Sequence, residues 1–388
     1  MKNNNKMILL LGLMAFLANG DNYAAAPLII NISKDLNLSV DVAALSVTAY
    51  MLSFGLFTLL FGPLSDRYGK VKIINIAAIG TAIFSILGGF AFNLTSLVVF
   101  RAMNGAFGAG IFPVTLALVG QSFDDKNRHK AIGKVMGLMF LGGATATALG
   151  GILAYLGSWR LVYIVYGVGE FILAMIILFT LERDKAVSTK FDLVDSYKEP
   201  FSNYKFMRLV FTIFFVGFSV FGSFTYTGQL VQNITGYNLL IVGLILSFFG
   251  VGTVIGGRVA PKLKMKLKGN FLVLAGIIGG VSLFLISFVS STIFIIISLF
   301  GFGVAFIFLQ STLVSSVQDM LPAKKGTAMS LASFNMFVGG AIGTNINGRI
   351  MNTFGIQQIF FNTSFIILIV GIVAAFFVTS FEKEKLKV

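Results

Sequence analysis

The sequence predicts an all-α membrane protein with twelve transmembrane helices arranged in two pseudo-symmetric six-helix bundles. Three observations support this prediction. The composition is too apolar for a soluble domain, the chain falls into twelve long runs with few or no charged residues, and the second half of the chain repeats features of the first.

The composition points to lipid as the solvent. Of the 388 residues, 56% are hydrophobic and only 11% are charged, whereas a soluble domain has about 25% charged residues. A soluble protein of this length would need more polar residues to cover its surface. The chain has no cysteine and a single histidine, His129, so thiol and metal chemistry are not expected. No cofactor is predicted.

Twelve runs with few or no charged residues are long enough to cross a bilayer, which takes about 20 apolar residues per helix. They lack the two-residue alternation of a membrane barrel, and in lipid a helix satisfies its own backbone groups. The expected spans are 7–30, 42–63, 71–92, 96–119, 131–156, 161–181, 206–228, 239–260, 271–289, 292–317, 327–351 and 359–381.

The distribution of positive charge predicts the orientation. If the N-terminus is cytoplasmic, all but four of the 29 basic residues fall on the cytoplasmic side. This agrees with the positive-inside rule and predicts a multi-pass protein of the cell (plasma) membrane with both termini in the cytoplasm. Because the net charge of +14 follows from topology, nucleic-acid binding is not expected. The four exceptions are Lys34, Arg101, Arg160 and Arg349.

A secretory signal is the alternative interpretation of the N-terminal region. Lys2 and Lys6 precede an apolar run, and Ala24, Ala25 and Ala26 offer a small-residue cleavage pattern. Cleavage would leave eleven spans and would reverse the charge bias unless the topology also changed.

The chain divides at a polar stretch into an N-terminal bundle (1–181), a cytoplasmic linker (182–205) and a C-terminal bundle (206–388). The segment 62–72 is echoed by 256–266, half the chain length later. A second echo relates the glycine pair at 142–143 to the pair at 339–340. Parallel six-helix repeats with a substrate site at their interface are typical of secondary transporters.

The segment from Gly62 to Lys72 resembles the signature loop of the major facilitator superfamily, which has the form G-x-L-x-D-R-x-G-R/K-x-x. Its glycines permit a tight turn, and Asp66 can accept hydrogen bonds from a helix N-terminus. The resemblance implies that this loop latches the two halves together on the cytoplasmic side. The residues of this gating motif are Gly62, Asp66, Arg67, Gly69 and Lys70.

Two further segments extend the resemblance over the chain. The start of span four, 98–110, is similar to the family's helix-four motif with its buried arginine, here Arg101, and has Asn104 where a glutamine is common. The segment 157–163 is similar to the G-W-R-x-x-F segment of bacterial drug and sugar efflux members, particularly the arabinose efflux permease-like group. Of the Gly-Pro-x-x-Gly-Gly motif of drug antiporters, 146–151 keeps only the second glycine pair.

The resemblance implies a secondary active transporter that exports small organic molecules (drugs, sugars or metabolites) by alternating access, coupled to protons. No Walker-type phosphate loop occurs, so an ion gradient would supply the energy. The expected partners are a small-molecule substrate, protons and the lipid bilayer. The protein is expected to be monomeric. Neither an enzyme nor a channel is expected. A metabolite uptake symporter and a lipid or glycolipid flippase are the alternatives.

Charged residues inside a span are costly and mark a pathway or a pair. At 1.5 Å per residue, Asp21 and Arg101 lie about 21 Å and about 22 Å from the inner edge of the hydrocarbon. Their depths agree, and the resemblance implies that helices one and four both line the central cavity. We therefore expect these two side chains to meet, either as a proton-coupling pair or as a permanent pair that only stabilises packing. Glu170 lies near the middle of span six and is the third proton-coupling candidate. The alternative is that it is neutral and only hydrogen-bonded locally.

Uncharged polar residues on the family's cavity helices are candidates for substrate binding. Each could equally hydrogen-bond between helices. These candidates are Asn22, Asn104, Gln310 and Asn335, together with Tyr226, whose ring could offer a stacking surface or belong to the core or the lipid face.

Overall fold

The computed structural model describes residues 2–123, 125–182, 184 and 193–385. Regular secondary structure in these residues is entirely helical, which confirms the predicted fold class. The first bundle contains α1 (Lys2–Asp35), α2 (Val40–Ala43), α3 (Leu45–Tyr68), α4 (Lys70–Gly89), α5 (Leu94–Gly108), α6 (Phe112–Ser122), α7 (Asp125–Leu156) and α8 (Trp159–Thr180). After α9 (Leu193–Ser202), the second contains α10 (Tyr204–Thr235), α11 (Leu239–Leu267), α12 (Asn270–Phe288), α13 (Thr292–Met320), the short 3₁₀ turn η1 (Pro322–Lys324), α14 (Lys325–Phe354) and α15 (Ile356–Lys385).

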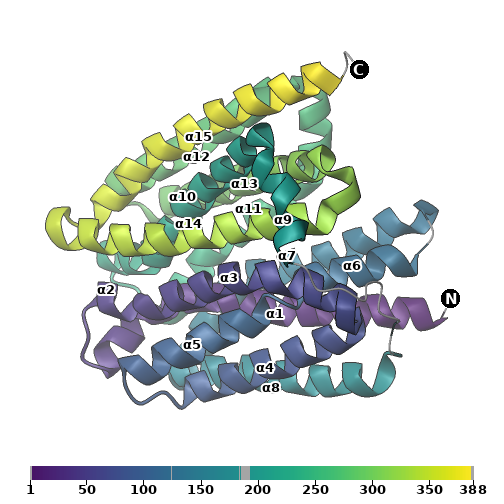
Figure 1. Ribbon diagram of the computed structural model, residues 1–388. Helices are drawn as coiled ribbons and strands as arrows, with labels where there is room; N and C mark the ends of the chain where they lie inside the picture. Colours follow the sequence, from purple (N-terminus) through teal and green to yellow (C-terminus); the bar gives the residue numbers. More distant parts are fainter. Residues whose placement is uncertain (1, 124, 183, 185–192, 386–388) are drawn as a thin grey trace.

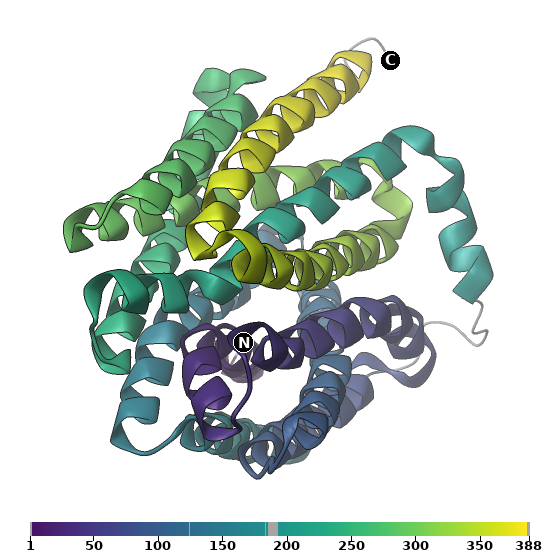
Figure 2. The ribbon, with the colours of Figure 1, turned by 90° about the vertical axis from the view of Figure 1, so that its left-hand side faces the viewer.

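The axes of the long helices are roughly aligned, and the helices form two bundles stacked on each other (Figure 1). Figure 2, seen from the end that carries α2, shows them as two groups of helices. We call the end of the molecule that carries both chain termini the terminal face, and the other end the opposite face. In Figure 1 the terminal face is on the right.

Among the described residues, eleven helical segments are long and apolar enough to cross a membrane. They match eleven of the twelve predicted spans. The remaining span, 327–351, is the 30-residue helix α14. This helix carries many serine, threonine, asparagine and glycine residues, and it packs between α10 of its own bundle and α3 of the other.

The predicted repeat is visible in the packing. A Cβ placed on Gly142 of α7 would lie 2.1 Å from the carbonyl oxygen of Phe16 in α1. A Cβ placed on Gly339 of α14 would lie 2.1 Å from the carbonyl oxygen of Phe214 in α10. The two echoed glycines therefore bring the fifth span against the first in one bundle, and the eleventh against the seventh in the other.

The two bundles meet along two seams, α7 against α11 and α3 against α14. On the first seam, Cβ atoms on Gly250 and Gly243 would lie 2.1 Å from the Cα of Ala144 and 2.4 Å from the carbonyl oxygen of Thr147. These contacts lie between the middle of the helices and the opposite face. Backbone therefore packs directly on backbone where the bundles close.

Span four is broken, whereas the sequence predicts one continuous helix over 96–119. α5 ends at Gly108, and α6 begins at Phe112. The turn between them uses hydrogen bonds from the amides of Gly110 and Ile111 to the carbonyls three residues earlier. Pro113 has no N–H to continue the helix, so the break follows from the sequence and brings backbone to the centre of the molecule.

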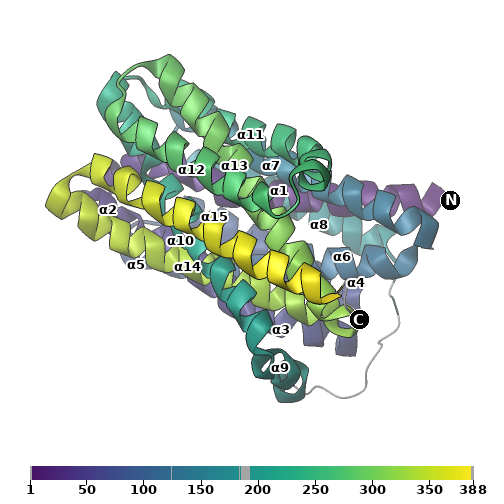
Figure 3. The same ribbon diagram turned by 90° about the horizontal axis from the view of Figure 1, so that it is seen from above.

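The linker contains a helix that touches both bundles. α9 packs on α10 and α14 of the second bundle and on α3 of the first, at the edge of the molecule near the terminal face (Figure 3). The hydroxyl of Tyr197 donates to the carbonyl of Leu59 at 2.9 Å, and Lys324 pairs with Glu199 at 2.9 Å. α9 therefore bridges the α3–α14 seam.

Candidate functional site

A central cavity lies between the two bundles. It has a volume of about 90 Å³. From the first bundle it is lined by one face of α1, by α3, by the break between α5 and α6, and by α7; from the second it is lined by α10, α13 and α14. The polar side chains in its lining are Asn19, Asn22, Tyr23, Tyr50, Gln310 and Ser333.

A larger cavity of about 1050 Å³ continues from the centre toward the terminal face. Phe112, Met139, Phe140, Gln310 and Met329 line both cavities. The mouth of the larger cavity is bounded by residues near the start of α1, by α7 and by α11. Here α7 and α11 have separated, whereas nearer the opposite face their backbones touch.

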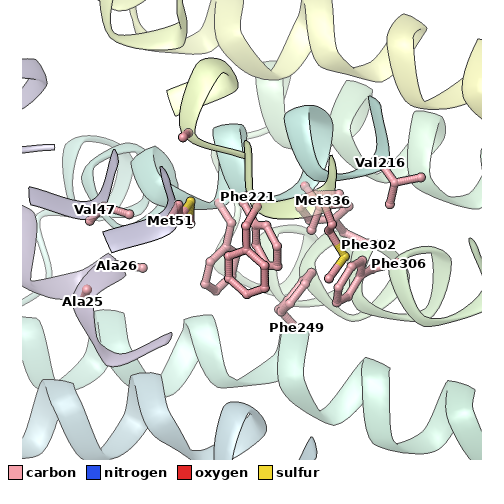
Figure 4. Close-up of a cluster of buried hydrophobic side chains, with 14 of the residues drawn as sticks. Ala25, Ala26, Val47, Met51, Val216, Phe221, Phe249, Phe302, Phe306 and Met336 are labelled. Carbon is pink, nitrogen blue, oxygen red and sulfur yellow. The ribbon is translucent and has the colours of Figure 1, made fainter. Parts of the chain in front are cut away.

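The central cavity is closed toward the opposite face by apolar packing. Figure 4 shows Phe221 with Ala25, Ala26, Val47 and Met51 of the first bundle on one side and with aromatic rings of the second bundle on the other. The rings of Phe54 and Phe337, from α3 and α14, stack at 4.0 Å between centroids. Only a void of about 20 Å³ remains beside Phe221. The structure is therefore open to the terminal face and closed to the opposite face.

Asp21 and Arg101 meet inside the first bundle, as predicted. Arg101 Nη1 lies 3.3 Å from both carboxylate oxygens of Asp21, and each side chain is 1% exposed. Ser85 Oγ lies 3.2 Å from Asp21 Oδ2 and can donate to it. Asp21 faces away from the cavity, whereas its neighbours Asn19, Asn22 and Tyr23 on α1 line it.

Arg101 contacts two aromatic rings in addition to its ion pair with Asp21. Its guanidinium carbon lies 4.5 Å from the ring centroid of Tyr50 and 4.9 Å from that of Tyr163. Such cation–π contacts stabilise a desolvated cation. Nη1 also donates to Asn104 Oδ1 at 3.1 Å, but Nε and Nη2 have no hydrogen-bond partner. The arginine is thus only partly satisfied.

Glu170 on α8 belongs to the same buried region. It is 0% exposed and close enough to Asp21 and Arg101 to interact with them electrostatically. Neither of its carboxylate oxygens has a hydrogen-bond partner, so the local hydrogen bond of the alternative interpretation is absent. The neighbouring tyrosines on this helix face, Tyr163 and Tyr166, keep their hydroxyls unpaired as well.

Of the five candidate substrate residues, two line the central cavity and three do not. Asn22 and Gln310 line the central cavity. Asn335 is outside both cavity linings and donates to the carbonyl of Leu331. Asn104 is outside both cavity linings, and its amide bonds to Arg101 and to the carbonyl of Thr81. Tyr226 is also outside both linings and lines a separate pocket near the opposite face.

The gating motif forms the turn between α3 and α4. Gly69 has φ +89°, a conformation that favours glycine, and Lys70 Nζ pairs with Asp66 Oδ1 at 3.0 Å. The acceptor for the N-terminus of α4 is Asp184, which takes hydrogen bonds from the amides of Lys70 and Val71 at 2.9 and 2.8 Å. The capping expected of Asp66 is therefore performed by a residue beyond α8.

The motif also lies at the seam between the bundles. Gly62 faces α14, where a Cβ on it would lie 3.6 Å from Ser330 Oγ. Arg67 lies over the ring of Tyr68, with 5.1 Å from the guanidinium carbon to the ring centroid. At the terminal face, α3 thus stays against α14 while α7 and α11 are apart.

In the described residues, twelve membrane-length helical segments, one of them broken, form two repeated bundles with a cavity between them that opens to one face. This arrangement defines a multi-pass membrane carrier. The chain belongs to the Major Facilitator Superfamily, whose family model matches residues 11–344. It is a transporter rather than an enzyme. Its family implies a small-molecule substrate and a lipid bilayer as surroundings.

Curated relatives include bacterial efflux proteins. The chain is 27% identical over 339 residues to the multi-drug resistance efflux pump PmrA of Streptococcus pneumoniae, with 83% of this chain and 82% of the relative covered. It is 25% identical to multidrug resistance protein 3 of Bacillus subtilis, with 88% and 78% covered.

Solved structures share the fold. A bacterial homologue of the human lysosomal transporter Spinster, in an inward-facing and unoccupied conformation, superposes with a TM-score of 0.80 at 17% identity, covering 98% of both chains. The nucleoside transporter NupG gives a TM-score of 0.77 at 12% identity, covering 94% of this chain and 98% of that one.

Proposed function

We propose that this transporter is a proton-coupled exporter of small organic molecules that works by alternating access, as a monomer in the plasma membrane with both termini in the cytoplasm. The observation that carries the proposal is the buried group formed by Asp21, Arg101 and Glu170. Asp21 pairs with Arg101, and Glu170 is fully buried and interacts electrostatically with both.

Charge counting gives this group one exchangeable proton. With both carboxylates ionised, the group holds one uncompensated negative charge in a low-dielectric interior, which is strongly unfavourable. With one carboxylate protonated it is neutral. Because Asp21 contacts Arg101 and Glu170 has no partner, the proton in this conformation belongs on Glu170.

Transfer of that proton to Asp21 would couple the group to the cavity. A neutral Asp21 no longer attracts Arg101, so α1 is freed to move against α5. The same helix turn carries Asn22 and Tyr23 into the central cavity. Proton movement inside the first bundle would therefore change the shape of the substrate site through α1.

The direction of transport and the orientation rest on two further arguments. The basic residues concentrate on the loops of the terminal face, which the positive-inside rule assigns to the cytoplasm. The cavity in this structure would then face the cytoplasm. The names of the curated relatives, a multi-drug resistance efflux pump and a multidrug resistance protein, favour export from that side.

Flux in proteoliposomes tests the proposal. The purified protein is reconstituted with a pH indicator inside, and a panel of fluorescent drugs, labelled sugars and headgroup-labelled lipids is offered with and without an imposed pH gradient. We expect saturable movement of a small organic molecule that dissipates the gradient and stops when a protonophore is added. Movement that is unaffected by the gradient, or movement of labelled lipid only, would contradict proton-coupled export.

A further inference from the structure

The lining of the central cavity indicates which kind of substrate the transporter binds. Gln310 on α13 lines both cavities, so it lies where the wide mouth narrows into the centre. Its Oε1 atom is buried and has no hydrogen-bond partner. Leaving a buried acceptor unpaired is costly, so this oxygen would be stabilised by a donor on a bound molecule when the side chain turns toward the cavity.

The charges around the path disfavour ionised substrates. Among the described residues that line the larger cavity, the ionisable ones are Lys134 and Arg258. These two basic residues repel cations. The described residues that line the central cavity include no carboxylate and no basic residue. An anion that passed the mouth would therefore lose its hydration without gaining a partner.

The remaining lining is aromatic from both bundles. Tyr23, Tyr50 and Phe54 come from the first bundle, and Phe221, Phe306 and Phe337 come from the second. Their rings stand in stacked and edge-on contacts with one another. Offset stacking and edge-to-face contacts are the interactions that such rings offer to another aromatic group.

The volumes of the two cavities indicate where a substrate would bind. The larger cavity has about 1050 Å³, which is enough for a drug-sized ligand. The central cavity, at about 90 Å³, is smaller than the roughly 150 Å³ that accommodates benzene. A ligand would therefore occupy the inner end of the larger cavity and push an aromatic part between the rings, while its polar group lies beside Gln310.

We infer that the substrate of this transporter is an uncharged aromatic amphiphile, and that Gln310 Oε1 accepts a hydrogen bond from its N–H or O–H group. This inference rests on the proposed export function for its biological meaning. It is tested by equilibrium binding without any gradient, so its failure is distinguishable from a failure of proton coupling.

The test uses three probes on the full-length protein in nanodiscs, with empty nanodiscs subtracted. 2-Naphthol is an uncharged aromatic donor, 2-methoxynaphthalene lacks the donor, and tetraphenylphosphonium is an aromatic cation. We expect 2-naphthol to bind about two- to tenfold more tightly than its methyl ether, the factor of one net hydrogen bond, and the cation to bind most weakly.

Two variants of Gln310 and one control complete the design. Gln310→Leu should abolish the difference between the two naphthalenes, and Gln310→Glu should make tetraphenylphosphonium the tightest of the three probes. Gln229→Leu is the matched control, because Gln229 is outside both cavity linings and bonded to Asn233. Equal binding of the two naphthalenes to the unaltered protein, preference for the cation, or no binding of any probe would overturn the inference.

Discussion

Arg101 Nη1 is equidistant from the two carboxylate oxygens of Asp21, at 3.3 Å from each, in a part of the first bundle that solvent does not reach. The pair lies behind the cavity wall rather than in it. Any effect of protons on the substrate site must therefore pass through the helices that hold the pair, α1 and α5.

Removing the arginine should destabilise the protein strongly. Arg101→Met leaves Asp21 buried without its cation, and loss of one partner of a buried pair costs about 3–5 kcal/mol. Adding Asp21→Asn to Arg101→Met removes the orphaned charge and should recover much of this loss. Thermal unfolding in detergent measures both, and a double variant no more stable than Arg101→Met would contradict this assignment of the pair.

Each of the two buried carboxylates, Asp21 and Glu170, should be essential for coupling transport to protons. In Asp21→Asn and in Glu170→Gln, one carboxylate and Arg101 remain in the buried group, which is then neutral without an exchangeable proton. We expect both variants to exchange substrate across liposomes down its gradient but to lose stimulation by a pH gradient. Asp319→Asn, an exposed carboxylate on α13, should behave as the unaltered protein. Undiminished gradient-driven flux in Asp21→Asn would show that the pair only stabilises packing.

Asp184 should anchor the gating turn. It accepts two backbone hydrogen bonds at the start of α4, and loss of such a cap costs about 0.5–2 kcal/mol. Asp184→Ala should lower the unfolding temperature and slow transport, because α4 begins in the turn beside α14. Asn238→Ala removes a comparable cap from α11 near the opposite face. It should lower stability while transport is retained; equal transport losses in the two variants would argue against a special role of Asp184.

Tyr197 should hold the linker helix on the α3–α14 seam over a wide pH range. Burial raises the pKa of the Tyr197 phenol from 10.0 to about 12. Because the folded pKa is higher than the unfolded one, the fold favours the neutral phenol. This contribution is complete below about pH 10 and is lost as the pH rises toward about 12.

Tyr197→Phe loses the hydrogen bond to Leu59, worth about 0.5–1.5 kcal/mol. It should therefore lower stability at neutral pH and flatten the loss of stability between pH 10 and pH 12. Thermal unfolding at several pH values checks this, with Tyr204→Phe, an exposed tyrosine on α10, as the control. Identical alkaline profiles for Tyr197→Phe and the unaltered protein would rule out the contribution of Tyr197.

The sequence predicts the architecture well because lipid imposes a simple pattern of length and polarity. Asp21 and Arg101 could be paired because depth along a helix follows from counting residues and because the family resemblance implies that helices one and four both line the cavity. The sequence does not reveal which side of a helix faces the cavity. Asn104 therefore looks like a substrate ligand until the structure shows its amide bonded to Arg101 and Thr81.

Other site residues had weaker signals. Asn19 shares a helix face with Asn22 at a spacing of three residues, which could have identified it as a cavity residue. Asp184 caps a helix that begins 114 residues earlier, and no local pattern predicts such a contact. Gly108, Gly110 and Pro113 indicate the break in span four. A prediction based on span length alone does not take these residues into account.

The central claim is that the two bundles rock so that the cavity opens to one face at a time, and the distances between α7 and α11 test it most directly. The chain has no cysteine, so spin labels can be attached at Lys134→Cys and Arg258→Cys near the terminal face, or at Leu156→Cys and Ile241→Cys near the opposite face. Gly250→Ala, which places a Cβ against Ala144, should shorten the first distance and lengthen the second. Gly257→Ala makes only an ordinary contact, with a Cβ 3.6 Å from Ile307, and should change neither. Opposite changes in the two distances are the predicted result; parallel changes, or no response to Gly250→Ala, would contradict alternating access.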